Sequence, residues 1–120
     1  MSRSLVVKIT CAAEAAERAN QGWTVAAMGL AAGADVTVWL TGEAAWFAVP
    51  GRQPDLDLPH ATAVTELIET VRTGGRIVVC SQCAARRDLT QDQLLPDVTI
   101  AGAAVFVESV LGDGVQALVY

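Results

Sequence analysis

Residues 76–87 have the sequence RIVVCSQCAARR, in which a short apolar stretch leads directly to two cysteines and two arginines. Residues 76–80 (RIVVC) are rich in β-branched side chains and apolar throughout their middle, which is typical of a parallel strand covered on both faces. Residues 81–87 favour a helix. A buried strand followed at once by a helix indicates the repeating unit of an α/β fold.

The same alternation extends along the whole chain. The predicted strands cover residues 4–10, 35–41, 76–80, 97–101 and 115–120, and the predicted helices cover residues 12–32, 43–49, 61–73, 81–87 and 102–111. In the last helix we expect Ala103, Phe106, Val107, Val110 and Leu111 to face inward. This order predicts a single domain over residues 1–120, a three-layer α/β/α sandwich on a mostly parallel five-stranded sheet.

Composition and charge exclude several classes of protein. The 120 residues are 52% hydrophobic and 18% charged, so the chain can bury a core and is not disordered. The net charge of −5 argues against a nucleic-acid binder that neutralises phosphates. No apolar run approaches the roughly 18 residues that a membrane span needs, and the first residues do not resemble a signal peptide. We therefore expect a cytoplasmic protein with no membrane partner.

Ligands of open α/β sheets bind at the carboxyl ends of the strands. Cys11, Thr41-Gly42 and Cys80 all lie at the carboxyl ends of predicted strands and so should lie at one edge of the sheet. The sequence predicts any functional site at that edge.

The C-x-x-C motif of Cys80 and Cys83 is the strongest local signal for chemistry. Cys80 ends a strand and Cys83 lies in the first helical turn, where free N–H groups and the helix dipole favour a thiolate. Arg87, one turn after Cys83, could add positive potential. The alternative is that both cysteines are small buried residues at a tight turn. A thioredoxin-like motif fits the flanking residues poorly, and a zinc site would have only Cys11 and His60 as further ligands.

Beyond the motif, the segment VCSQCAARRD (residues 79–88) resembles the C-x-x-C-x-x-x-R-G motif of the DsrE/DsrF-like family, which includes TusD-like sulfur-relay subunits. The resemblance extends over nearly the whole chain. It includes Glu17-Arg18-Ala19 in the first helix, the stretch GADVTVWLTG (residues 33–42) and the turn TIAG (residues 99–102). The sequence departs from the family at Asp88, where glycine is usual, and at Cys11-Ala12-Ala13, where many members have a polar turn.

The resemblance implies roles for three residues. Cys80 matches the cysteine that receives sulfane sulfur as a persulfide, Cys83 matches a second cysteine that only some members have, and Arg87 matches the arginine of the motif. It further implies a sulfurtransferase or sulfur carrier that needs no cofactor, exchanges sulfur with donor and acceptor proteins, and assembles as a homotrimer or homohexamer.

A second hypothesis is a non-catalytic oligomeric binding or scaffold subunit whose thiols are structural. Cys11 favours a buried core position over a site thiol, and His60 favours a solvated loop position over a general base. Trp39 is expected in the core, and Trp46-Phe47 at a subunit interface.

Overall fold

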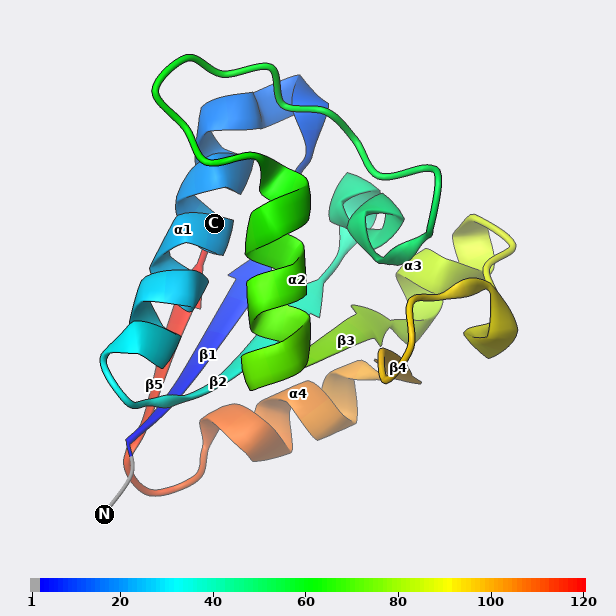
Figure 1. Cartoon of the computed structure of the whole chain (residues 1–120). Helices are drawn as coiled ribbons and strands as arrows, with labels where there is room; N and C mark the ends of the chain where they lie inside the picture. Colours follow the sequence, from blue (N-terminus) through cyan, green and yellow to red (C-terminus); the bar gives the residue numbers. More distant parts are fainter. Residues whose placement is uncertain (1–2) are drawn as a thin grey trace.

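The computed structural model describes residues 3–120 and has three layers, with a parallel sheet between helices (Figure 1). The sheet order is β4-β3-β2-β1-β5, and every neighbouring pair is parallel. The strands are β1 (Ser4–Ile9), β2 (Asp35–Leu40), β3 (Arg76–Cys80), β4 (Thr99–Ala101) and β5 (Val115–Val119); the helices are α1 (Ala16–Ala31), α2 (Val64–Gly74), α3 (Ser81–Arg86) and α4 (Ala103–Val110). Short 3-10 turns cover η1 (Ala13–Ala15), η2 (Gly42–Ala48) and η3 (Gln91–Gln93).

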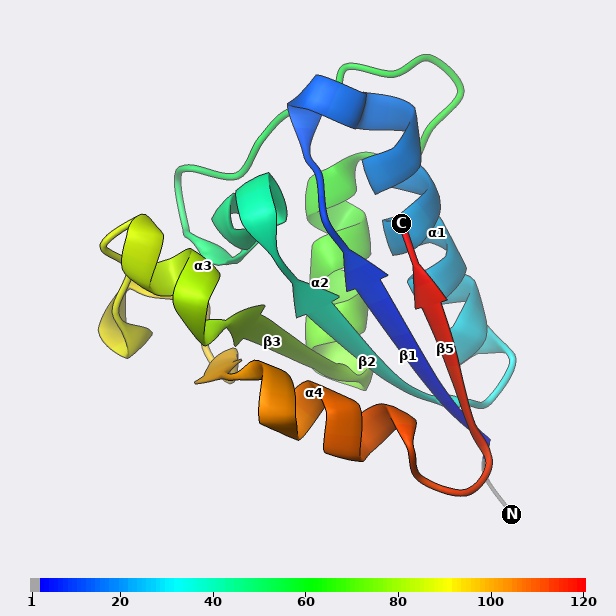
Figure 2. The ribbon, with the colours of Figure 1, turned by 180° about the vertical axis from the view of Figure 1, so that it is seen from behind.

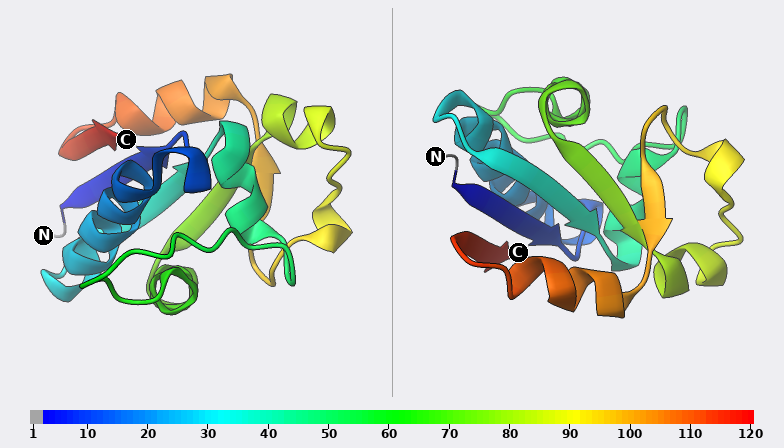
Figure 3. Two further views of the ribbon diagram at one scale, coloured as in Figure 1. Left: turned by 90° about the horizontal axis from the view of Figure 1, so that it is seen from above. Right: turned by 90° about the horizontal axis from the view of Figure 1, so that it is seen from below.

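The direction of the chain across the sheet decides which face each helix covers. From β1 to β3 the chain moves toward one edge, and α1 and α2 lie on one face. From β4 it returns across the whole sheet to β5, and α4 lies on the opposite face (Figures 2 and 3). Right-handed crossovers require this change of face when the direction reverses. The α/β/α sandwich predicted from the sequence is thus confirmed.

The packing of α1 on the sheet is unusually close because small residues face the strands. A Cβ at Gly22 would lie 2.7 Å from Ile9 Cγ1, and one at Gly29 would lie 2.8 Å from a methyl group of Leu5. Ala19 and Ala26, on the same face, are fully buried. This close contact explains part of the high alanine content.

The core also contains two aromatic rings that meet edge to face. Trp23 of α1 and Phe47 of η2 are fully buried, with ring centroids 5.7 Å apart and planes at 82°. The expected interface role of Trp46-Phe47 is therefore wrong for Phe47, whereas Trp46 is half-buried and stacks with Arg52. Trp39, 3% exposed, lies in the core as predicted.

Several helices and strands begin at other residues than predicted. Helix α1 begins at Ala16 rather than residue 12, because the 3-10 turn η1 precedes it. Helix α2 begins three residues later than the apolar pattern suggested, because Ala63 has an extended backbone that ends the preceding loop. Strand β4 begins at Thr99 rather than residue 97, since Asp97 has a left-handed backbone with φ of 68° that a strand cannot include.

Helix α4 is less buried than its sequence indicated. None of its residues is buried; Val107 is 49% exposed, and Leu111, the residue after the helix, is 76% exposed. Ala103 is exposed as well, so the inward-facing set is reduced to the half-buried Phe106 and Val110. A single short helix covers this face of the sheet, and no second helix packs on its outer side among residues 3–120. Within the same residues, no helix has the length and apolar character to cross a membrane.

The close approach of α1 predicts the effect of filling one of its gaps. We expect Gly22→Ala to lower the free energy of unfolding by about 1–3 kcal/mol, because the new methyl group must displace the buried side chain of Ile9. Alanine's helix propensity opposes this by only about 1 kcal/mol. Urea unfolding measures the difference. Gln21→Ala, exposed on the same helix, is the control and should change stability by less than about 0.5 kcal/mol. A more stable Gly22→Ala variant would contradict the packing described.

Candidate active site at the carboxyl ends of the strands

The parallel strands bring three of the residues singled out from the sequence to one edge of the sheet. Cys11 follows β1, Gly42 follows β2, and Cys80 ends β3. Main-chain contacts tie these ends together: the Thr41 N–H donates to the Ile9 carbonyl oxygen at 3.0 Å, and the Thr10 N–H to Tyr120 at 2.8 Å. These hydrogen bonds hold the strand ends that carry the cysteines in fixed positions relative to one another.

Cys80 lies at the junction of β3 and α3 and is half-buried. Its side chain points to the face of the sheet that carries α4, because Ile77 and Val79, at alternating positions, are buried on the other face. Burial alone would raise the pKa of the Cys80 thiol. The nearby Cys83 backbone and thiol, the Gln82 backbone N–H and the Lys8 ammonium outweigh that effect and hold the pKa below its ordinary value. Neither N–H makes a capping hydrogen bond of standard geometry to Cys80.

Cys83 lies one helical turn away and is more enclosed, with 7% exposure. Its Sγ accepts a hydrogen bond from the Gly42 N–H at 3.1 Å, which joins α3 to the turn after β2. Gly42 can fill this position because its φ is +56° and a Cβ there would lie 2.9 Å from the Thr10 carbonyl oxygen. The second cysteine of the motif is thus held by the backbone of a neighbouring strand end.

Arg87 lies just after α3 and is bound to a carboxylate. Its Nε and Nη2 both donate to Glu43 Oε2, at 3.1 and 2.8 Å, and its Nη1 donates to the Cys83 carbonyl oxygen at 3.2 Å. Because Glu43 balances the guanidinium charge, the arrangement favours a structural clamp between η2 and α3 over a free positive charge beside the cysteines. The sequence had suggested such a free charge.

Cys11 and His60 lie outside the immediate surroundings of Cys80. Cys11 is 4% exposed, packs in the core and has its thiol 3.7 Å from the Ala15 carbonyl oxygen; burial raises the pKa of this thiol. His60 is exposed in the loop that passes over α1, where it borders a cavity of about 220 Å³ with Glu17 and Asn20. Neither Cys80 nor Cys83 borders this cavity. The loop itself crosses above the start of α1 (Figure 1).

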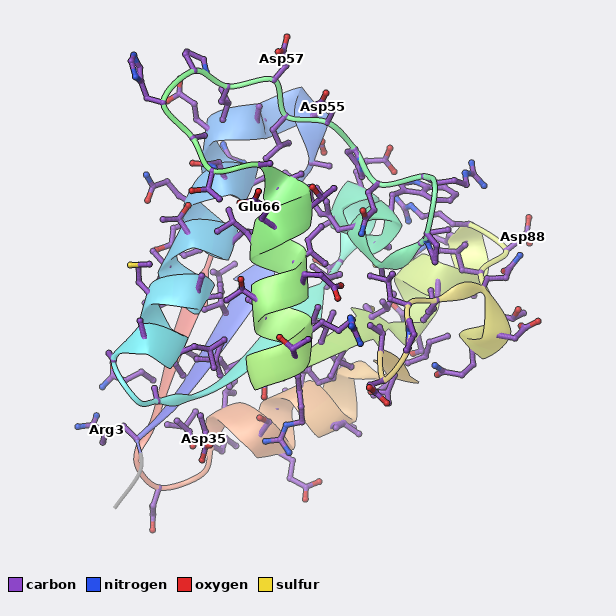
Figure 4. The ribbon with its side chains drawn as sticks, viewed as in Figure 1. Arg3, Asp35, Asp55, Asp57, Glu66 and Asp88 are labelled. Carbon is purple, nitrogen blue, oxygen red and sulfur yellow. The ribbon has the colours of Figure 1, made fainter. Side chains whose placement is uncertain are left out.

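Asp88, the position at which the sequence departs from the family motif, follows α3 in a left-handed conformation with φ of 54°. Glycine is the usual residue for this conformation at the end of a helix, and aspartate tolerates it better than most residues do. The Asp88 side chain is exposed and points away from the body of the protein (Figure 4). The substitution therefore preserves the turn and directs the extra negative charge into solvent.

Two charged residues of this edge were not identified from the sequence. Lys8 precedes the end of β1 and Glu43 follows β2, and each looked like an ordinary surface residue. Only the register of the strands and the turn at Gly42 bring them to the cysteines. Within residues 3–120, no three His, Cys, Asp or Glu side chains gather in a group that could hold a metal ion.

Two solved structures share the fold. The ychN protein from E. coli has a TM-score of 0.81 at 15% sequence identity, covering 98% of this chain and 99% of that one. MTH1491 from Methanobacterium thermoautotrophicum, described as a protein of unknown function, has a TM-score of 0.64 at 13% identity, with both chains covered completely. A comparison with curated proteins finds no match.

The sequence itself matches one family model over residues 4–118, from the first residue of β1 into β5. The match includes both cysteines of the C-x-x-C motif and Arg87. The protein therefore belongs to the DsrE/DsrF-like family.

Proposed function

We propose that this protein accepts sulfane sulfur on Cys80 as a persulfide and relays it to a partner. The observation that carries the proposal is the contrast among the cysteines: Cys80 is half-buried and has a lowered pKa, whereas Cys11 is buried and has a raised one. The thiolate is the nucleophilic form of cysteine. Membership of the family suggests a role of the sulfur-relay type.

The proposed transfer needs no cofactor and no oxidant. The Cys80 thiolate attacks the outer sulfur of a donor persulfide, R–S–SH. A new S–S bond forms on Cys80, the donor S–S bond breaks, and the donor leaves as R–S⁻. An acceptor thiolate then attacks the outer sulfur of the Cys80 persulfide and restores the Cys80 thiolate. Donor and acceptor are proteins that present such thiols, and the cytoplasm, where thiols stay reduced, is the compartment that suits this exchange.

A role for Cys83 follows from its place one turn away. Its thiolate could attack the inner sulfur of the Cys80 persulfide, forming a Cys80–Cys83 disulfide and releasing HS⁻. A dithiol reductant would then restore both thiols. Arg87 would serve this site by holding α3 against η2 through Glu43.

The alternative function is an oligomeric binding or scaffold subunit, and a surface feature is consistent with it. Most of the large exposed hydrophobic side chains among residues 3–120 belong to α4, the residue after it, and β5: Val105, Val107, Leu111, Leu118 and Val119. An apolar surface of this kind is typical of an interface with other protein chains. It is equally compatible with the homotrimer or homohexamer proposed for a sulfur carrier, so assembly does not distinguish the two functions.

The direct test of sulfur transfer is a mass measurement. Incubation with a low-molecular-weight persulfide should add about 32 Da to one cysteine, and peptide mapping should place it on Cys80. Cys80→Ser should abolish the adduct. Cys11→Ala is the matched control and should keep it, because this buried thiol takes no part in transfer. An adduct that persists in Cys80→Ser, or that never forms in the wild type, favours the scaffold alternative.

The role of Cys83 is tested by mild oxidation. We expect the wild-type protein to lose two titratable thiols and form an intrachain link, because cysteines three residues apart at a helix start can bring their Cβ atoms within about 4 Å. Cys83→Ala should form no such link. If the wild type keeps all its thiols under the same conditions, Cys80 acts without a resolving partner.

Assembly is tested by light scattering at micromolar concentration, where we expect a trimer or hexamer. The double variant Val107→Glu/Leu111→Glu places two charges on the exposed stripe of α4 and should shift the protein toward monomers. Met28→Glu, which changes an exposed apolar side chain of α1, should leave the assembly intact. A wild-type monomer would contradict the oligomer.

A further inference from the structure

A lysine emerges from the same face of the sheet as Cys80. Lys8 of β1 is in register with Trp39 of β2, and Trp39 is in register with Val78 of β3. Residues in register on neighbouring parallel strands share a face, and side chains alternate along each strand. Cys80, two residues beyond Val78, therefore points to the same side as Lys8, beneath α4.

Aromatic side chains hold the lysine in place. The Lys8 Nζ lies 4.8 Å from the centroid of the Phe106 ring, which belongs to α4. Phe106 in turn packs edge to face against the buried Trp39, with centroids 5.3 Å apart. A cation over an aromatic face is stabilised without being neutralised. Among residues 3–120, no carboxylate lies within ion-pair distance of Lys8, so its charge remains available.

We propose that Lys8 stabilises the anionic sulfur of Cys80, both as the thiolate that receives sulfur and as the persulfide that carries it, and that Phe106 positions the ammonium for this role. The inference rests on the proposed function and deepens it by naming the cation of the site. It assigns to Lys8 the part that the motif arginine would otherwise be expected to play.

The other charged and titratable groups around Cys80 are either paired with each other or exposed to solvent, apart from the Cys83 thiol. On α3 these are the Cys83 thiol and the exposed Arg86; Glu43 of η2 is paired with Arg87. Strand β4 and the first turn of α4 carry no titratable side chain, and Glu108, further along α4, is exposed to solvent. Lys8 lowers the pKa of Cys80, although less than the Cys83 and Gln82 groups do, and the direction of its effect agrees with this placement.

The test is the rate of Cys80 alkylation by iodoacetamide as a function of pH, followed by peptide mapping in the full chain. In Lys8→Met the rise in rate with pH should move to higher pH, because the thiolate has lost its cation. At a pH below the pKa, the rate should fall about 3- to 10-fold, since a shift of one pKa unit changes the thiolate fraction tenfold. Lys8→Arg keeps the charge and should restore most of the rate. Phe106→Leu should cause a smaller shift in the same direction.

Two controls keep the result specific. Arg76→Met removes one positive charge from the same face of β3, but four residues, or about 13 Å, from Cys80, and should leave the profile unchanged. The rate at high pH, where the thiol is fully ionised, reports access of the reagent and should change less than about twofold in every variant. This readout separates a loss of charge from a disturbed fold.

The inference is overturned if Lys8→Met and the wild type have the same pH profile, or if Arg76→Met shifts it as much as Lys8→Met does. The experiments can reject the role of Lys8 and the proposed function independently of each other. A shifted profile in Lys8→Met with no persulfide adduct in the wild type would retain the role of Lys8 and reject sulfur transfer. An adduct on Cys80 with an unchanged profile would do the reverse.

Discussion

The parallel alignment of the five strands is the constraint on which the site depends. Because every strand runs in the same direction, β1, β2 and β3 end at one edge, and each end contributes a residue to the surroundings of the cysteines. Gly42 is the point where these contributions meet, since a Cβ there would lie 2.9 Å from the Thr10 carbonyl oxygen, and its N–H donates to Cys83 Sγ. A side chain at this position would separate β1 from the turn that holds α3. The geometry of the motif is therefore set by the main chain of neighbouring strands as much as by the motif itself.

The two faces of the sheet differ in how completely helices cover them. On one face, α1 and α2 exclude solvent from a core of branched aliphatic side chains, and Gly22 and Gly29 let α1 approach closely. On the other, the short helix α4 covers the sheet incompletely, so that Cys80 is half-buried rather than sealed. A thiol on the tightly packed face would resemble Cys11, whose burial raises its pKa. Its partial exposure, together with its lowered pKa, makes Cys80 the candidate nucleophile.

Sequence patterns predicted the fold well because its elements depend on local signals. The apolar strand RIVVC and the helix predicted over residues 61–73 each depend on residues close together in the sequence, and the structure has both, the second as α2. The prediction that all five apolar residues of the last helix face inward was wrong. The pattern of a helix shows which residues are apolar, but it does not show how many neighbours the fold supplies to cover them. Val107 and Leu111 have the spacing of a buried helix face, but within residues 3–120 no further helix packs over them.

The surroundings of Cys80 could be predicted only in part. Strand ends and the C-x-x-C spacing placed both cysteines at the edge, because those features are sequential. The charged residues around the cysteines lie far from their partners in the sequence. Glu43 binds Arg87, which is 44 positions away, and Lys8 shares a face of the sheet with Cys80 only through the register of three strands. Register is fixed by packing over the whole sheet, which no short motif encodes.

Helix α4 connects the two proposals physically. Its inner side carries Phe106, which supports the Lys8 ammonium, and its outer side carries Val107 and Leu111 one turn apart, exposed to solvent. A rigid helix of eight residues cannot shift on one side without shifting on the other. A protein that packs against Val107 and Leu111 would therefore restrain Phe106 as well, and with it the position of the positive charge relative to Cys80. Coulomb energy depends on that separation, so if Lys8 acts on Cys80 as proposed, occupancy of the α4 surface would change the reactivity of the thiol through one helix.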